Sequence, residues 1–375
     1  MPAKIAYINY YYDRDISLSE YFIRYPSIPG WCNAITGEDF EVNVYQRFNQ
    51  DLFLRKDKVT YNLINDGENH RLKSLQRPEA FHEKIIRDKP DLIHVNSLDY
   101  VYQAYALKKK SPSSRIIIQH HAEKAWKGPG KIMRKYFSKS ADGFIFSSKG
   151  IYDDWISSNA LPRNKNFAEI TEGSTFFSRS DRKDAKSKTD LNGNPVFLWV
   201  GRLNSNKDPL TVISGFQLLL KDFPLAKLYM IYSENDLEQD ILSLVSNQNR
   251  LNDSVQLLGK IDHTQMQDYY NSADYFVLGS HYEGSGYSLI EAIACGVVPI
   301  VTDIPSFKTI TCNGKIGGLW KASNAESFYQ AAKKVLALPL NYESEKTAAL
   351  FKSNLSYEII SQKAKEFYKK LLNEK

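Results

Sequence analysis

The sequence predicts an α/β protein made of two doubly wound domains, each built on a parallel sheet. Its 375 residues, 42% of them hydrophobic, are enough for two separate cores. Short β-branched or aromatic runs alternate with amphipathic stretches, and the runs are apolar nearly throughout, as in strands buried on both faces. The strand candidates are KIAYIN (4–9), DLIHV (91–95), RIIIQ (115–119), GFIFSS (143–148), VFLWV (196–200), AKLYMIY (226–232), VQLLG (255–259), DYFVLG (274–279) and VVPIV (297–301).

The segments between these runs predict helices and one linker. EAFHEKIIRD and DYVYQAYALKKK have helical periodicity, and residues 357–372 place an apolar stripe on one face, which is typical of a docking helix. The stretch SRSDRKDAKSKTDLNGNP (178–195) is charged and has no apolar residues beyond Ala185 and Leu191. It is therefore interpreted as the linker between the two domains.

Composition narrows the class of protein. The net charge of +6, from 49 basic and 43 acidic residues, gives no global indication of nucleic acid as a partner. Cys32, Cys295 and Cys312 lack C-x-x-C spacing, which favours a reducing, cytoplasmic compartment without a zinc site. The apolar stretch near the N-terminus is too short for a signal peptide, and no window approaches about 18 uncharged apolar residues. We expect a soluble protein, at most peripheral to a membrane.

Ligands of open α/β sheets bind outside the carboxyl ends of the strands, so the strand exits are the places to look for chemistry. The sequence has neither G-x-G-x-x-G after its first strand nor a G-x-x-x-x-G-K-[ST] loop, which removes support for Rossmann-type NAD binding and for P-loop chemistry. GRLNSNKDPL (201–210) follows the strand VFLWV and carries Arg202 and Lys207 before a predicted helix. These cations suit a diphosphate, although a pair of solvated loop cations is the alternative.

A second strand exit carries YEGSGYSLIEAIACG (282–296). The pattern predicts a turn and then a helix whose first residues, Gly286, Tyr287 and Ser288, offer backbone N–H groups to an anion. The glycines of the turn let the backbone approach a ligand closely.

Two glutamates stand eight residues apart in this stretch. Glu291 lies about one turn inside the predicted helix, where its carboxylate can accept two hydrogen bonds from a vicinal diol such as a ribose. Glu283 precedes the turn and can reach a sugar hydroxyl at the far end of a diphosphate. In a chain this charged, such a spacing also arises by coincidence, so the argument depends on its combination with the turn, the helix start and the Arg202–Lys207 pair.

Together, GRLNSNKDP and the pattern E-G-x-G-x-S-L-I-E-A-x-A-C-G-V-x-P-I-V resemble the donor-binding domain of the GT-B retaining glycosyltransferases of family 4, the glycosyl transferases group 1. The resemblance covers the second half of the chain. It implies a GT-B fold, in which two Rossmann-like domains face a central cleft and a C-terminal helix crosses back to the first domain. The corresponding ranges are 1–185 for the acceptor-side domain, 356–375 for the helix that completes it, and 190–355 for the donor-binding domain.

The resemblance also implies roles for single residues. Glu283 contacts the donor sugar and is a catalytic candidate, Glu291 binds the nucleotide ribose, and Arg202 and Lys207 hold the diphosphate. Base recognition in such sites runs largely through backbone, here near Gly259 and Lys260.

The first half resembles the family in layout only. NYYYDRDISLSEYF follows the first strand where members often carry a glycine-rich loop, so the acceptor side stays undefined. The family places a histidine at a strand exit near the donor sugar, and RIIIQHHAE offers His120 and His121. Alternation puts the two on opposite faces. His121 is the preferred catalytic candidate because the family histidine lies two residues after a polar one, here Gln119.

The expected activity is retaining, hexosyl-type transfer from a UDP or GDP sugar to a glycan or lipid-linked acceptor in cell-surface or exopolysaccharide synthesis. The resemblance implies a same-face mechanism in which the leaving phosphate helps to deprotonate the acceptor. No cofactor or metal is expected. Two alternatives stay open: a GT-B nucleotide-sugar epimerase, and a non-catalytic nucleotide-sugar-binding subunit. The second would be expected to lack one of the four donor-site residues, and all four are present.

Residues 108–139 carry ten basic side chains against one acid, Glu123. Trp126 and other apolar residues of AWKGPGKIMRKYF lie among the cations, a mixture typical of segments at a membrane interface. This mixture would suit an anionic membrane surface at the inner face of the cell membrane as a partner, and a solvated basic face is the other interpretation of the same residues. The cations are Lys108, Lys109, Lys110, Arg115, Lys124, Lys127, Lys131, Arg134, Lys135 and Lys139.

Overall fold

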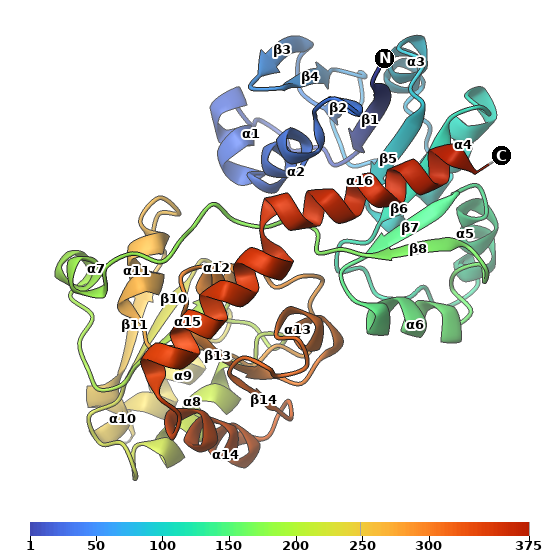
Figure 1. Cartoon of the computed structure of the whole chain (residues 1–375). Helices are drawn as coiled ribbons and strands as arrows, with labels where there is room; N and C mark the ends of the chain where they lie inside the picture. The colour runs from blue at the N-terminus through green and yellow to red at the C-terminus, as the bar shows by residue number, and fades with distance from the viewer. Residues whose placement is uncertain (248, 375) are drawn as a thin grey trace. The chain divides into compact units, whose positions relative to one another are not determined.

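The structure, a computed structural model, describes residues 1–247 and 249–374. Contacts group them into two units (Figure 1): unit 1 is Met1–Ser174 together with the chain from Tyr357 onward, and unit 2 is Thr175–Ser356. The predicted division placed residues up to 185 in the first domain. The contacts instead assign residues 175–185 to unit 2.

Unit 1 contains an eight-stranded sheet in the order β3-β4-β2-β1-β5-β6-β7-β8. All neighbours are parallel except β3 and β4, which form an antiparallel hairpin at one edge. The strands are β1 (Ala3–Asn9), β2 (Phe40–Arg47), β3 (Leu52–Lys56), β4 (Val59–Ile64), β5 (Leu92–Asn96), β6 (Arg115–Gln119), β7 (Gly143–Phe146) and β8 (Asn166–Glu169).

Helices cover both faces of this sheet, as the doubly wound prediction requires. Alternate residues of β1 enter two different apolar clusters: Ile5 packs with α2 and α16, and Ile8 packs with α3, α4 and α6. The helices are α1 (Leu18–Arg24), α2 (Ser27–Ile35), α3 (Glu79–Arg87), α4 (Val101–Lys110) after the 3-10 turn η1 (Leu98–Tyr100), α5 (Gly130–Ser138), α6 (Lys149–Ser157) and α16 (Tyr357–Asn373).

The C-terminal helix α16 belongs to unit 1, as the apolar stripe at 357–372 predicts. Besides its apolar face it carries a buried polar contact: His94 Nδ1 lies 2.5 Å from Tyr368 Oη, and His94 Nε2 lies 2.9 Å from Gln119 Oε1. Because the amide oxygen accepts from Nε2–H, Nδ1 accepts from the tyrosine hydroxyl. Burial lowers the pKa of His94 to about 3, so the imidazole is neutral and fixes α16 without burying a charge.

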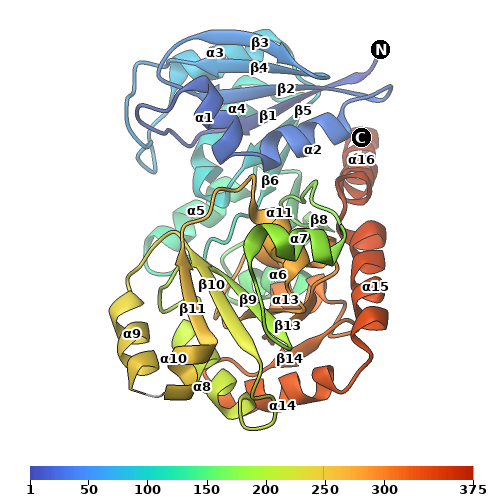
Figure 2. The same cartoon turned by 90° about the vertical axis from the view of Figure 1, so that its left-hand side faces the viewer.

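Unit 2 contains a six-stranded, fully parallel sheet in the order β11-β10-β9-β12-β13-β14. Figure 2 shows β11, β10 and β9 side by side. The strands are β9 (Val196–Gly201), β10 (Lys227–Tyr232), β11 (Val255–Gly259), β12 (Tyr275–Leu278), β13 (Val298–Thr302) and β14 (Gly318–Trp320).

The helices of unit 2 pack around this sheet in one continuous apolar cluster. They are α7 (Arg182–Thr189), α8 (Pro209–Leu219), α9 (Glu238–Ser246), α10 (Asn249–Ser254), α11 (Met266–Ser272), α12 (Tyr287–Ala294), α13 (Pro305–Ile310), α14 (Ala325–Leu336), α15 (Leu340–Leu350) and a π-helical turn η2 (Phe351–Leu355).

The predicted linker at 178–195 is wrong. Residues 182–189 form α7, which packs against α11, and Ala185 is buried. Asp181 caps the helix by accepting hydrogen bonds from the backbone N–H groups of residues 183 and 184 at 2.8 and 3.1 Å. The charged residues that suggested a linker are the outer face of this helix, and Arg182 pairs with Asp274 of the same unit.

Across residues 1–247 and 249–374, no helix is both long and apolar enough to cross a bilayer.

Candidate active site

The loop that follows β9 carries the two predicted diphosphate-binding cations in different surroundings. The guanidinium of Arg202 is exposed, with its Nη1 3.7 Å from Glu234 Oε1, and both side chains are about half accessible. Such a surface pair contributes little energy and leaves Arg202 open to a ligand. Lys207 is buried, and its Nζ forms an ion pair with Glu283 Oε1.

The Lys207–Glu283 pair joins two strand exits. The carboxylate of Glu283 is 13% accessible and the ammonium-bearing side chain 11%, so solvent screens the pair weakly. The sequence predicts a phosphate contact for Lys207 and a sugar contact for Glu283, and the structure brings the two together.

Backbone contacts hold the same two loops against each other. The N–H of His281 donates to the carbonyl of Asn206 at 2.8 Å, and the Asn206 side-chain amide donates to the carbonyl of Tyr282 at 3.0 Å. At Gly279, at the end of β12, a Cβ atom would lie 2.8 Å from the carbonyl oxygen of Asp208. A glycine is therefore needed there for the β9 and β12 exits to approach this closely.

The predicted turn and the helix start after it are present in the structure. Helix α12 begins at Tyr287, and Gly286 at its N-cap has φ +66°. A Cβ on Gly286 would lie 2.6 Å from Phe307 Cε1, so both the backbone angle and the space require glycine. The amino end of α12, at Tyr287 and Ser288, thus lies directly beyond the turn that carries Glu283, where the helix dipole favours negative charge.

Glu291 is held by two residues that the sequence analysis did not identify. His263 Nε2 lies 2.8 Å from Glu291 Oε1, and the hydroxyl of Tyr270 donates to Oε2 at 2.9 Å. Phe177 stacks on the imidazole with ring centroids 5.0 Å apart. The hydrogen bond to Glu291 raises the pKa of His263, while burial raises the pKa of Tyr270. The carboxylate is thereby fixed in one orientation, and each oxygen keeps a lone pair for a further donor.

The backbone predicted to recognise the base lies at the exit of β11. Gly259 has φ +69°, and an added Cβ would meet no atom within 4 Å. The register of β10 with β11 shifts beside it, so that Ile231 pairs with Gly259. Lys260 follows with an exposed side chain. The backbone of Gly259 is therefore not covered by neighbouring side chains on the side where a Cβ would stand.

The two candidate histidines of unit 1 differ sharply in their environment. His120 is fully buried, stacked on Phe146 at 4.7 Å and edge-on to Trp155. It packs in the core, so its selection as a catalytic candidate is not favoured by the structure. His121 is one-quarter accessible, and its Nδ1 lies 3.0 Å from Glu172 Oε2.

The sequence analysis did not identify three residues whose side chains contact predicted site residues. His263 and Tyr270 orient Glu291, and Glu172 contacts His121. Glu172 stands in AEITEGS three residues after β8, a strand that the sequence analysis did not predict, so its place at a strand exit gave no signal in the sequence.

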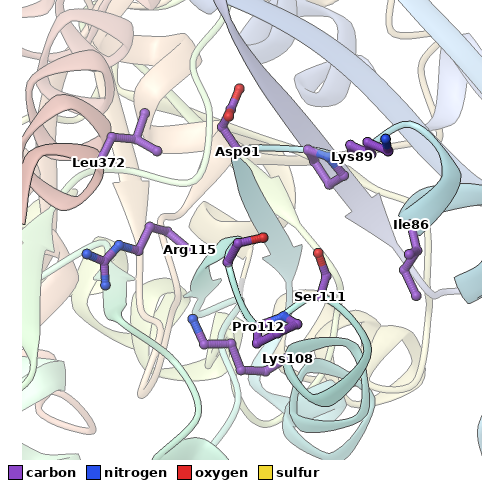
Figure 3. Close-up of a pocket in the computed structure, with 10 residues that line it drawn as sticks. Ile86, Lys89, Asp91, Lys108, Ser111, Pro112, Arg115 and Leu372 are labelled. Carbon is purple, nitrogen blue, oxygen red and sulfur yellow. The ribbon is translucent and has the colours of Figure 1, made fainter. Parts of the chain in front are cut away.

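A pocket of about 860 Å³ lies elsewhere, at the amino ends of β5 and β6. Figure 3 shows Asp91, Lys108 and Arg115 around it, with Leu372 of α16 at one side. Lys108 and Arg115 both form ion pairs with the single carboxylate of Asp142. The pocket contains none of the predicted site residues and lies at the strand ends where ligands of open α/β sheets do not bind.

Comparison with solved structures identifies the class of fold. A glycosyltransferase from Rickettsia africae ESF-5 superposes with a TM-score of 0.74 at 16% identity, covering 100% of both chains. Sucrose-phosphate synthase from Thermosynechococcus elongatus gives a TM-score of 0.71 at 18% identity, covering 98% of this chain and 99% of the other. The fold is the GT-B fold of glycosyltransferases, as the sequence resemblance implies.

Sequence comparison places the second half of the chain. Residues 181–353, nearly all of unit 2, match the family model described as "Glycosyl transferases group 1". Among relatives, the GDP-mannose:cellobiosyl-diphosphopolyprenol alpha-mannosyltransferase of Xanthomonas oryzae pv. oryzae (strain PXO99A) is 23% identical over 271 residues, covering 69% of this chain and 68% of the relative. The family match and the relatives support a glycosyltransferase of group 1 that acts on nucleotide sugars.

Proposed function

We propose that the protein transfers a hexosyl group, with retention of anomeric configuration, from a UDP or GDP sugar to a glycan or lipid-linked acceptor in cell-surface or exopolysaccharide synthesis. The observation that carries this proposal is the Lys207–Glu283 pair beside the amino end of α12, in the unit that matches the family. The Xanthomonas relative uses, by its name, a GDP sugar and a diphosphopolyprenol-linked acceptor, and this supports the lipid-linked class.

Each of the site residues binds a different part of the donor. Arg202, Lys207 and the amino end of α12 hold the diphosphate, because they gather positive charge at adjoining strand exits. Glu291 accepts hydrogen bonds from the ribose, and the backbone at Gly259 and Lys260 lies against the base. The supporting contacts are those of His263 and Tyr270, which leave the Glu291 carboxylate oriented but able to accept further bonds.

Transfer proceeds by charge stabilisation. As the sugar–phosphate bond breaks, negative charge grows on the diphosphate, where Lys207 and the α12 amino end are preorganised to stabilise it. Glu283 contacts the sugar, on which positive charge develops. The leaving phosphate then takes the proton of the acceptor hydroxyl on the face from which it left. We propose no metal or cofactor for this step, because Lys207 and the amino end of α12 supply the positive charge that the leaving diphosphate needs.

A donor screen followed by product analysis tests the proposal. Thermal unfolding is measured with UDP, GDP, ADP and their sugars, since a ligand at 100 times its Kd adds about 2.7 kcal/mol of stability. The stabilising donor is then incubated with lipid-linked and free glycans, and the anomeric configuration of the product is read by NMR. An inverted product would overturn the retaining mechanism. Donor turnover without an acceptor would indicate an epimerase, and stabilisation without any turnover would indicate a binding subunit.

We further propose that α5 contacts an anionic membrane surface. The proposed contact surface is smaller than the range 108–139 that the sequence indicates. Three of the ten cations are paired with acids outside that stretch: Lys108 and Arg115 with Asp142, and Lys110 with Glu79. The interaction surface therefore centres on residues 124–139.

Some apolar residues of this segment are buried and others are exposed. Trp126 is buried against Trp155, with ring centroids 4.9 Å apart. Ile132, Met133 and Tyr136 of α5 are exposed, at 76%, 39% and 55%. Exposed apolar side chains among cations are the features of an interfacial helix, in which each cation contributes about 1 kcal/mol near an anionic surface.

Flotation with liposomes of anionic and of zwitterionic lipid tests this surface. We expect salt-sensitive binding to the anionic vesicles, lost in the double variant Ile132→Ser/Tyr136→Ser. Ile23→Ser is the matched control, because Ile23 is exposed to 71% on α1. Absence of binding at low ionic strength, or equal binding by all variants, would remove this part of the proposal.

A further inference from the structure

The carboxylate of Glu172 lies against the imidazole of His121 across two strand exits. His121 follows β6 and Glu172 follows β8, with β7 between these strands in the sheet. Nδ1 of His121 lies 3.0 Å from Oε2 of Glu172, and the two side chains are 25% and 8% accessible. Because a carboxylate accepts, Nδ1 carries a proton and donates to it.

The other ring nitrogen is left for a ligand. Nε2 of His121 is buried and has no hydrogen-bond partner among residues 1–247 and 249–374. Buried polar atoms in proteins are nearly always paired, so an unpaired ring nitrogen at a strand exit indicates a group supplied by a substrate.

The backbone that carries His121 is fixed separately, by Glu123. One Glu123 oxygen accepts from the backbone N–H of His121, and the other accepts from the hydroxyl of Ser97 and from the N–H of Leu98 at 2.9 Å. Ser97 has φ +113°, a strained value for a residue with a side chain. Glu123 thus holds the loops, and Glu172 contacts the ring.

We propose that Glu172 is a positioning residue for glycosyl transfer: it fixes the His121 ring with Nδ1–H toward its own carboxylate and Nε2 toward a substrate oxygen. This inference rests on the proposed function, because it needs a substrate at the exits of β6 and β8. It adds to that function a residue outside the donor-binding motifs of unit 2.

Charge supports the same arrangement. Burial acts to lower the pKa of His121, but the Glu172 carboxylate outweighs this, with a smaller contribution from Glu123, and the pKa is raised. His94 also faces this ring from β5, but burial keeps its own pKa at about 3, so it stays neutral. The protonated ring can donate from both nitrogens, one to Glu172 and one to substrate.

The test compares Glu172→Gln with wild type by two independent measurements. NMR of the imidazole ¹⁵N signals follows the titration of His121, identified by its absence in His121→Asn. Steady-state kinetics with the donor and acceptor found in the screen give the pH dependence of kcat and KM. Glu83→Gln is the matched control, because it removes an exposed carboxylate from α3 of the same unit.

We expect Glu172→Gln to lower the pKa of His121 and to move the alkaline limb of the kcat profile to lower pH by the same amount. We expect kcat to fall about 10- to 150-fold, the range for losing a charged hydrogen bond, with KM for the donor nearly unchanged. Glu172→Asp should restore part of the activity. Circular dichroism checks that each variant is folded.

The outcomes separate the two proposals. An unchanged His121 titration, or a titration that moves while kcat and its pH profile do not, would overturn the positioning role and leave the glycosyltransferase function intact. Absence of transfer by wild type with every donor would overturn the proposed function. The positioning role would fall with it, because no substrate would then meet Nε2.

Discussion

The ion pair between Lys207 and Glu283 predicts that these two residues act on the nucleotide in opposite directions. In the structure the Glu283 carboxylate neutralises part of the lysine charge that the diphosphate would use. Glu283→Gln removes the competing carboxylate but keeps a hydrogen-bonding side chain of similar shape. We therefore expect binding of the nucleoside diphosphate to be unchanged or tighter, while kcat falls because the sugar loses its charged contact.

The size of the lysine effect follows from burial. The side chains of Lys207 and Glu283 are 11% and 13% accessible, so water screens their charges weakly. The free energy of a charged hydrogen bond therefore applies, and this is larger than that of a neutral one. A charge-assisted hydrogen bond contributes about 1.5–3 kcal/mol, so Lys207→Met should raise the Kd for the diphosphate about 10- to 150-fold. The same variant leaves Glu283 without its counter-charge, and this carboxylate then repels the diphosphate.

A double-mutant cycle separates the loss of the lysine charge from the repulsion by the unpaired Glu283 carboxylate. It is measured by calorimetric titration of the nucleoside diphosphate that binds in the donor screen. Adding Glu283→Gln to Lys207→Met should recover affinity by a coupling energy of about 0.5–3 kcal/mol. Glu234→Gln is the control, because it removes the exposed partner of Arg202 at 3.7 Å and should leave the Kd nearly unchanged. If the single effects add within about 0.5 kcal/mol, the reasoning from the ion pair is refuted.

Three further predictions concern the same unit. Glu291→Gln should weaken binding of the nucleoside diphosphate and of its sugar by the same factor, about 10- to 100-fold, and calorimetry of both ligands checks this. Because Glu291 raises the pKa of His263, the His263–Glu291 pair contributes its full stability below about pH 6.5, and this contribution is lost as the pH rises through the raised pKa. Urea unfolding over this pH range should show the loss of stability in wild type but not in Glu291→Gln. Gly286→Ala should cost at least about 1 kcal/mol of stability in urea unfolding, because φ is +66° and the added Cβ would lie 2.6 Å from Phe307, whereas Gly37→Ala, with no atom within 4 Å, should cost less.

Most of the strands that could be predicted are buried on both faces; β11, at an edge of the unit 2 sheet, is apolar but only partly buried. RIIIQ and VQLLG match β6 (Arg115–Gln119) and β11 (Val255–Gly259) at both ends, and the other seven candidates lie within one or two residues of a strand. Their apolar runs are the direct result of burial between two layers of helices.

The strands that were missed lack this signal for physical reasons. β2 alternates apolar residues with Glu41 and Asn43, and β3 and β8 lie at the edges of the sheet. An edge strand has neighbours on one side only, so its sequence need not be apolar throughout. β14 has three residues, too few for any periodicity. The false linker has the same origin: α7 needs only Ala185 and the cap at Asp181 to pack, and its other positions face water.

In the candidate site, sequence predicted the residues but not their partners. The turn geometry of Gly286, the start of α12 and the position of Glu291 all follow from local pattern. His263 and Tyr270, in contrast, reach Glu291 from a loop and a helix whose approach depends on how α11 packs. The same applies to Lys207 and Glu283, which the sequence assigns to different parts of a donor and the structure pairs. Contacts between side chains far apart in sequence depend on tertiary packing, which the motif spacing does not record.

The place of α16 in the fold has a consequence for biosynthesis. On the ribosome, all of unit 2 emerges after most of unit 1 but before the helix that completes it. Until Tyr368 arrives to donate to His94, part of one face of the first sheet stays uncovered, and Nδ1 of His94 has no hydrogen-bond donor from α16. The second unit can thus finish folding first although most of it is translated later than unit 1. A chain that ends before residue 357 would expose the apolar surface that α16 covers, and such a surface promotes aggregation, chaperone binding and proteolysis.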